Sequence, residues 1–199
     1  MFKRISKKNE SKSTLLKSMF VDEASNFKSG AIEISSKEKK LIVLDKLNEL
    51  LGVPKKNQQF RIITKKNINS FDFILAVLGN NEIIEEMIIA FYRIGKKVII
   101  ELNELQKLNE IRNITFLIND GFPKLVPDAY NILKTFESPF WKIKLENNHT
   151  KIICLKTNKN NFYVIEGSGN LSINARIEQY VFDNDKNLFN FHKKWISEL

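Results

Sequence analysis

The sequence has very little cysteine and no long apolar run. Its single cysteine, Cys154, excludes an intrachain disulfide and a metal cluster built from cysteines. No stretch approaches the ~20 consecutive apolar residues that a membrane-spanning helix needs. The basic segment 1–8 is followed by Asn, Glu and Ser rather than by the apolar part of a secretion signal. We therefore expect a cytoplasmic protein without a membrane partner.

Glycine and proline are also scarce. Seven glycines and four prolines in 199 residues argue against a fibrous or loop-dominated protein. The chain is 43% hydrophobic, and its fifteen phenylalanines supply bulk for one sizeable core. Its 32 Lys and Arg residues outnumber 23 Asp and Glu residues, which gives a formal net charge of +9. This charge suits a phosphate polyanion as partner, although a chain generally rich in Lys, Asn and Ile would carry it too.

The N-terminal region differs in composition from the rest. Residues 1–40 are rich in Lys, Ser and Glu, which is typical of a mobile basic arm. Over 38–51, leucines recur at the spacing of an amphipathic helix until a glycine and a proline end the pattern. These leucines are Leu41, Leu44, Leu47, Leu50 and Leu51. The sequence predicts an N-terminal basic arm and amphipathic helix over 1–57 and a second domain over 58–199.

In the second domain, strand-like and helix-like segments alternate, which predicts an α/β sandwich with a central mixed sheet flanked by helices. The predicted strands are 60–64, 84–94, 114–118, 140–145, 150–155, 162–165 and 175–182. For 84–94, two glutamates leave a helix possible. The predicted helices are 69–78 with Ser70 as its N-cap, 97–111, 127–136 and a closing amphipathic helix over 188–196.

A histidine and a lysine stand at the start of a strongly apolar segment over 150–155. Apolar residues on both faces of this segment indicate a central strand that is covered on each side. In an extended chain, side chains at positions i and i+2 point the same way and lie roughly 7 Å apart. The imidazole of His149 and the ammonium of Lys151 would therefore face one ligand.

The next predicted strand runs into the turn Gly167-Ser168-Gly169-Asn170. Glycine lets backbone N–H groups approach an anion closely, while a Ser hydroxyl and an Asn amide donate to phosphate oxygens. Alone, such a turn is more often a simple hairpin connection. Its position one strand length after His149 is what indicates a phosphate site.

The order H-x-K, a strand-length gap and G-S-x-N resembles the signature of the phospholipase D superfamily. The resemblance is strongest over 149–195, and the single motif is similar to that of the small bacterial and phage-type nucleases of this family. It implies that a motif histidine attacks phosphorus to give a phosphohistidine, while the histidine of a second motif protonates the leaving oxygen. Water then completes hydrolysis, and neither a metal nor another cofactor is required.

Carried onto this chain, the resemblance makes His149 the nucleophile or the general acid, according to subunit. Since one motif supplies one histidine, a complete site implies a homodimer. Glu178 resembles the carboxylate that orients a catalytic histidine, with an exposed strand glutamate as an equal alternative. Lys151 and Asn170 would help stabilise the transition state. The residues expected at the phosphate are Lys151, Gly167, Ser168, Gly169 and Asn170.

One position departs from the family pattern, because Lys156 stands where the family's aspartate is expected, five residues after the lysine. The leading hypothesis is a metal-independent phosphodiesterase of nuclease type that acts on nucleic acid, with DNA favoured over RNA as the partner and the choice between them left open. The second hypothesis is a nucleic-acid-binding protein of a phage or mobile element that keeps the phosphate pocket with little or no catalysis. Only the first predicts strand cleavage.

Overall fold

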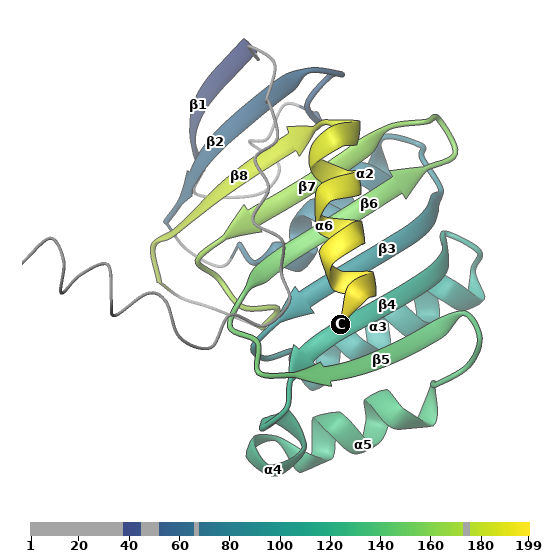
Figure 1. The fold of residues 1–199 in the computed structure, drawn as a ribbon. Helices are drawn as coiled ribbons and strands as arrows, with labels where there is room; N and C mark the ends of the chain where they lie inside the picture. The colour runs from purple at the N-terminus through teal and green to yellow at the C-terminus, as the bar shows by residue number, and fades with distance from the viewer. Residues whose placement is uncertain (1–37, 45–51, 66–67, 173–175) are drawn as a thin grey trace, which may run out of the picture. The chain divides into compact units, whose positions relative to one another are not determined.

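A computed structural model describes residues 38–44, 52–65, 68–172 and 176–199. The strands in these residues are β1 (Glu38–Leu44), β2 (Gln58–Thr64), β3 (Ile84–Phe91), β4 (Ile111–Asn119), β5 (Trp141–Glu146), β6 (Lys151–Thr157), β7 (Phe162–Gly167) and β8 (Glu178–Asn184). They form one sheet in the order β1-β2-β8-β7-β6-β3-β4-β5 (Figure 1). Because β3, β4 and β5 are parallel while β6, β7 and β8 are antiparallel to their neighbours, the sheet is mixed, as predicted.

Helices cover both faces of the sheet, which confirms the predicted α/β sandwich. α6 (Lys186–Glu198) lies in front of the sheet in Figure 1 and packs on it through Leu188, Phe189 and Ile196. The helices with buried residues in the core on the opposite face are α2 (Ser70–Gly79), α3 (Lys96–Lys107), α4 (Phe122–Leu125) and α5 (Pro127–Thr135). No helix in the described ranges is both long and apolar enough to cross a membrane.

The central strand β6 contributes side chains to both cores. Ile153 and Leu155 belong to the core beneath α2 and α3, whereas Ile152 and Cys154 belong to the core beneath α6. A strand that is covered on both faces has to be apolar throughout, so its sequence predicts it well. Burial raises the pKa of the Cys154 thiol well above its ordinary value, which keeps this side chain protonated inside the core.

Residues 38–44 form strand β1, so the helix predicted from the leucine spacing is wrong there. β1 is paired in parallel with β2 at one edge of the sheet. The run Leu-Ile-Val-Leu fits both the leucine spacing of a helix and the β-branched composition of a strand, and pairing with β2 decides between them. The sheet therefore begins before residue 58. The rest of the predicted helix, 45–51, and the predicted arm up to residue 37 lie outside the described residues.

Helix α2 forms where a helix is predicted, but its N-cap is Asn69 rather than Ser70. The Asn69 side chain accepts a hydrogen bond from the N–H of Phe71, and the Asp72 carboxylate accepts one from the N–H of Asn69, both at 2.7 Å. This reciprocal pair is a capping box. The Ser70 hydroxyl donates instead to the carbonyl oxygen of Gly169 at 3.1 Å, which ties the start of α2 to the glycine turn.

Candidate functional site

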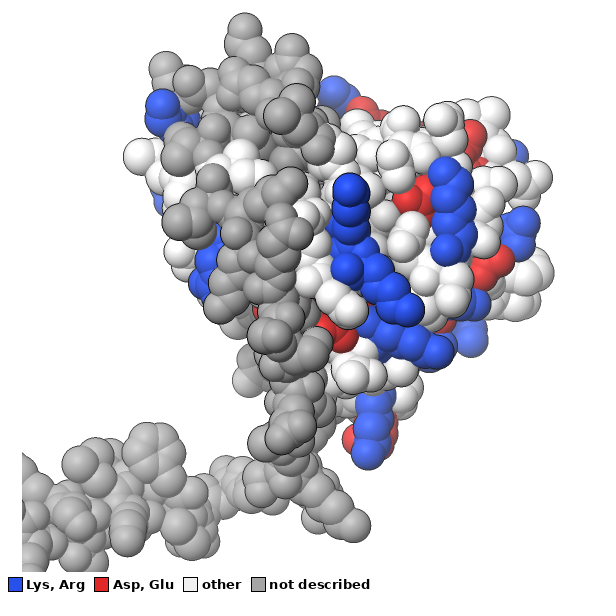
Figure 2. All heavy atoms as spheres, turned by 90° about the horizontal axis from the view of Figure 1, so that it is seen from above, with Lys and Arg blue, Asp and Glu red and all other residues white. Residues whose placement is uncertain are grey.

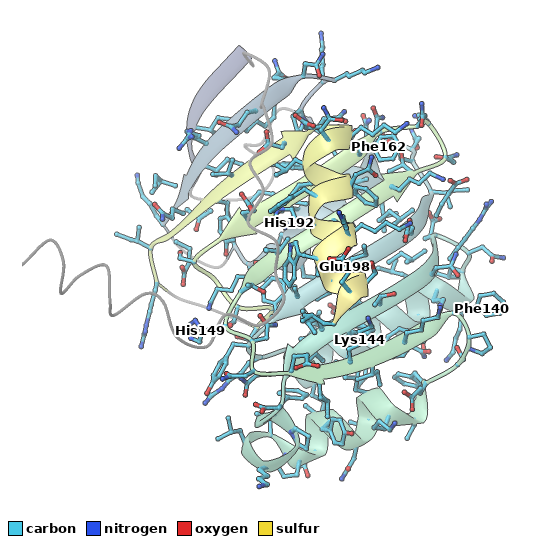
Figure 3. All side chains as sticks on the ribbon, in the orientation of Figure 1. Phe140, Lys144, His149, Phe162, His192 and Glu198 are labelled. Carbon is cyan, nitrogen blue, oxygen red and sulfur yellow. The ribbon has the colours of Figure 1, made fainter. Side chains whose placement is uncertain are left out.

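The predicted site residues lie at one end of the sheet. Because β6 is antiparallel to both β3 and β7, His149, which lies two residues before β6, is close to the ends of those strands. Gly167 is the last residue of β7, and Glu178 is the first residue of β8. The parallel strands β3, β4 and β5 have their carboxyl ends here, which is where open α/β sheets bind ligands. Figure 3 shows His149 at this end and Phe140 at the other.

His149 is exposed and has two close neighbours. The Lys151 ammonium donates to the backbone oxygen of His149 at 3.1 Å, and its Nζ lies 3.4 Å from Nδ1 of the imidazole. The ring of Tyr92 lies with its centroid 4.9 Å from that of His149, at an interplanar angle of 46°. The imidazole and the ammonium therefore lie side by side at the surface, where one ligand can reach both.

Two opposing effects act on the charge of Lys151. Its partial burial lowers the pKa of the ammonium below the ordinary value, and the carboxylate of Glu178 works against that shift. This electrostatic interaction links Lys151 to Glu178, which follows the Gly167–Asn170 turn in the sequence. The site therefore combines an ammonium with a carboxylate that favours its charged form.

Asn148 holds the backbone that carries His149. Its buried side-chain amide donates to the carbonyl oxygens of Phe91 at 3.3 Å and Leu117 at 3.1 Å, at the ends of β3 and β4. The oxygen of the same amide accepts from the N–H of Thr150 at 2.9 Å and from its hydroxyl at 2.7 Å. Nothing in the sequence singles out Asn148, because its role depends on where two other strands end.

Glu178 is buried against Ser168. The Ser168 hydroxyl donates to a Glu178 carboxylate oxygen, and it accepts a hydrogen bond from the N–H of Gln179 at 3.1 Å. The backbone N–H of Ser168 donates to the carbonyl oxygen of Gln179, also at 3.1 Å. The hydroxyl that was expected to bind phosphate is therefore bonded to the carboxylate that was expected to orient the histidine.

The two glycines of the turn pack directly on the ring of Tyr180. A Cβ atom at Gly167 would lie 2.3 Å from Cδ1 of Tyr180, and one at Gly169 would lie 2.2 Å from the Tyr180 hydroxyl oxygen. Burial raises the pKa of Tyr180 to about 12, so the ring carries a neutral hydroxyl beneath the turn. Packing thus accounts for both glycines, and their expected backbone contacts to phosphate stay a prediction.

The turn also carries an unsatisfied amide. The side-chain oxygen of Asn170 is buried and has no hydrogen-bond partner among the described residues. Buried polar atoms in proteins are nearly always bonded, so this oxygen is an exception. Because it is an acceptor, it can receive a hydrogen bond from a donor but cannot contact a phosphate oxygen. The expected contact between the Asn170 amide N–H and phosphate therefore stays a prediction.

The short segment between β3 and α3, residues 92–95, contacts both His149 and the residue that follows the Gly167–Asn170 turn. Tyr92 contacts His149, as described above, while Ile94 forms a parallel bridge with Leu171 and the N–H of Gly95 donates to the Leu171 carbonyl oxygen at 2.7 Å. Residues 92–95 thus contact the histidine at one end and the residue after Asn170 at the other. This connection was visible only once the fold placed β3 beside β6.

Lys156 lies away from this site. Successive side chains on a strand point to opposite faces, so Lys156 faces α6 with Cys154, whereas Lys151 faces the other side with Ile153. Five residues along an extended strand also correspond to about 16 Å. Lys156 forms a salt bridge with Glu85 at 2.9 Å. Lys156, the position where the resemblance predicts an aspartate, is therefore not a neighbour of His149.

The second histidine of the chain lies on the α6 side of the sheet. His192 is buried, its Nδ1 accepts a hydrogen bond from the Trp195 indole at 3.0 Å, and its Nε2 lies 3.0 Å from a carboxylate oxygen of Glu166. Glu166, although next to Gly167 in sequence, points to the opposite face of the sheet. The pair holds α6 against β7 and lies on the far face from the phosphate motif.

The described part of the chain holds no group of three or more His, Cys, Asp or Glu side chains that could bind a metal ion. The candidate site instead brings together one imidazole, one ammonium and one carboxylate. In comparisons with known proteins, no protein-family model matches this chain and no curated protein matches it.

Proposed function

We propose that this protein is a phosphodiesterase of nuclease type that cuts nucleic acid, DNA rather than RNA, without a metal. The observation that carries the proposal is the convergence of His149 and Lys151 with the turn at Ser168 and with Glu178, although these residues come from separate strands. The net charge of +9 supports a polyanionic substrate. Figure 2 shows Lys and Arg side chains on the face seen from above, with Asp and Glu side chains among them.

In the proposed reaction, a ring nitrogen of one His149 attacks phosphorus and the bond from phosphorus to the leaving strand breaks. A second histidine gives its proton to the leaving oxygen. Water then attacks the phosphohistidine, gives a proton to that second histidine, and frees the first one. Lys151 and the Asn170 amide would offset the charge that builds up on the phosphoryl oxygens.

The second histidine has to come from another copy of the chain. The sequence contains only two histidines, and His192 is buried on the opposite face of the sheet. A homodimer with two copies of His149 facing one phosphate supplies both imidazoles. In mixtures with His149→Asn subunits, activity should then fall as the square of the wild-type fraction. A linear fall would contradict the shared site.

The decisive test is cleavage of a labelled DNA oligonucleotide in EDTA. We expect the wild-type protein to cut it and to form an acid-labile phosphoryl adduct on His149. His149→Asn should lose both, whereas Asn147→Ala, a change at an exposed neighbour in the same loop, should retain both. Protein that binds the oligonucleotide but neither cuts it nor becomes labelled would be the non-catalytic binding protein.

A further inference from the structure

Beyond the motif, a partly exposed aromatic ring lies beside the imidazole. The ring centroid of Tyr92 is 4.9 Å from that of His149, and the guanidinium carbon of Arg93 is 5.2 Å from the Tyr92 centroid. Arg93 is exposed. Three flat groups, the imidazole, the phenol ring and the guanidinium, therefore follow one another outward from the phosphate motif.

Neither Tyr92 nor Arg93 is needed to build the hydrophobic core. The neighbouring residues Phe91 and Ile94 are fully buried in that core, whereas the Tyr92 ring is not among its members. Arg93 forms no salt bridge with any carboxylate in the described ranges. An aromatic ring and a guanidinium that no carboxylate of the described residues pairs with thus remain at the surface next to the proposed reaction centre.

These two groups have the chemistry of a nucleotide subsite. Unpaired bases stack on aromatic rings and on guanidinium planes, at about 1–3 kcal/mol per base, and arginine also binds phosphate through a fork of N–H donors. With one phosphodiester at His149, the flanking base would lie at Tyr92 and the next phosphate would be within reach of Arg93. Base stacking on a side chain needs a base that is not already stacked within a duplex.

The surface on the other side of the turn has mixed charge. A hollow of about 430 Å³ lies there, and its lining includes Lys96 and Lys97 but also the carboxylates of Asp72 and Glu101. Because these carboxylates would repel a polyanion, the strand contacts that we infer lie on the side of Tyr92 and Arg93.

We propose that Tyr92 and Arg93 form a base-and-phosphate subsite for single-stranded nucleic acid. The proposal rests on the proposed function only in placing a phosphodiester at His149. It concerns binding, so it can fail or hold whether or not the protein cuts.

The test compares two single-stranded DNA oligonucleotides of equal length, one with all its bases and one with consecutive abasic sites at its centre. Binding is measured by fluorescence anisotropy in the His149→Asn background, which prevents cleavage. Tyr92→Leu should weaken binding of the base-bearing strand by about 5- to 150-fold and leave the abasic strand within about twofold. Tyr92→Phe should bind both strands like the parent protein.

Phe140→Leu is the matched control, because Phe140 is 61% exposed and lies at the opposite end of the sheet. It should change neither affinity. Arg93→Gln should reduce the slope of log affinity against log salt by about 0.7, the value for one phosphate contact on a single strand. Equal losses for both strands in Tyr92→Leu, no loss at all, or no DNA binding would each overturn the subsite. Intact cleavage without a Tyr92 effect would remove the subsite and leave the proposed nuclease in place.

Discussion

The two ends of the sheet each bury a glutamate, but in different surroundings. Glu82, just before β3, is 1% exposed, and each of its two oxygens accepts two hydrogen bonds from neutral side chains. The donors are Asn80, Thr157, Asn161 and Tyr163. Glu178, at the other end, is 8% exposed and accepts from the hydroxyl of Ser168. Both carboxylates join neighbouring segments of the sheet.

The difference lies in what surrounds each carboxylate. Burial alone would raise the pKa of Glu82, but its four hydrogen bonds lower it below the ordinary value. Its donors are all neutral side chains of the fold, so the cluster is complete in itself. Glu178 instead interacts electrostatically with the Lys151 ammonium, which lies beside the exposed imidazole of His149. A saturated cluster of neutral side chains holds the fold together, whereas an ammonium and an imidazole at the surface can take part in binding a ligand.

The largest effect is expected from a change at Glu178, which should lower the cleavage rate rather than the stability. Glu178→Gln should lower the rate of DNA cleavage by about 10²-fold, because a neutral amide replaces the charge beside Lys151. Since Glu178 raises the pKa of Lys151, the same change should lower that pKa further and move the alkaline limb of the pH–rate profile to lower pH. The free energy of unfolding should change by less than about 1 kcal/mol in urea titrations. Unchanged cleavage would separate Glu178 from the site.

Added side-chain volume in the Gly167–Asn170 turn should lower the stability, because the turn packs tightly on Tyr180. Gly167→Ala should cost about 3 kcal/mol of unfolding free energy, because its Cβ would lie 2.3 Å from the Tyr180 ring and 2.8 Å from the backbone oxygen of Gln179. Gly169→Ala should cost less, since its closest contact is the tip of the Tyr180 side chain at 2.2 Å. Chemical denaturation of both variants checks the order, and equal costs would contradict the packing.

Glu82→Gln should lower the free energy of unfolding by about 2 kcal/mol, because the new amide donor faces donors and leaves some unpaired. Cleavage per folded molecule should be unchanged. The folded-state pKa of Glu82 is below its unfolded value, so its contribution is present above the ordinary pKa of 4.5 and is lost as pH falls through the folded value. Urea titrations across this range should therefore show less acid sensitivity in the variant than in the wild type.

The smallest effect should come from introducing the aspartate that the phospholipase D resemblance predicts at residue 156. Lys156→Asp should leave cleavage within about twofold, because residue 156 faces α6 and lies about 16 Å along β6 from Lys151. The lost salt bridge to Glu85 lies at the surface, so the free energy of unfolding should change little. A large gain in cleavage would show that the missing aspartate limits catalysis in this chain.

The two ends also differ in how far the sequence predicts them. His149 and Lys151 stand out because an apolar strand follows them. The Gly167–Asn170 turn stands out because the next strand leads into it. Asn148 does not stand out, although it fixes the backbone beside His149. For Tyr92, near the end of a predicted core strand, the sequence favours packing over a place at the border of a substrate groove. The Glu82 cluster is equally hidden, since its partners lie up to 81 residues away and meet only through strand pairing.

Local pattern alone determined the α/β class and the apolar strand β6, because periodicity and composition are properties of neighbouring residues. It also picked out the segments 149–151 and 167–170 in the sequence. It failed for 38–44, where a helical spacing of leucines yielded to pairing with β2, and at Ser70, where Asn69 makes the better cap. Only the tertiary structure decided that residues 92–95 join the two halves of the motif and that Lys156 faces away from them. Those facts depend on strand order and on which face of the sheet each residue occupies, and hydrogen bonding between distant segments sets both.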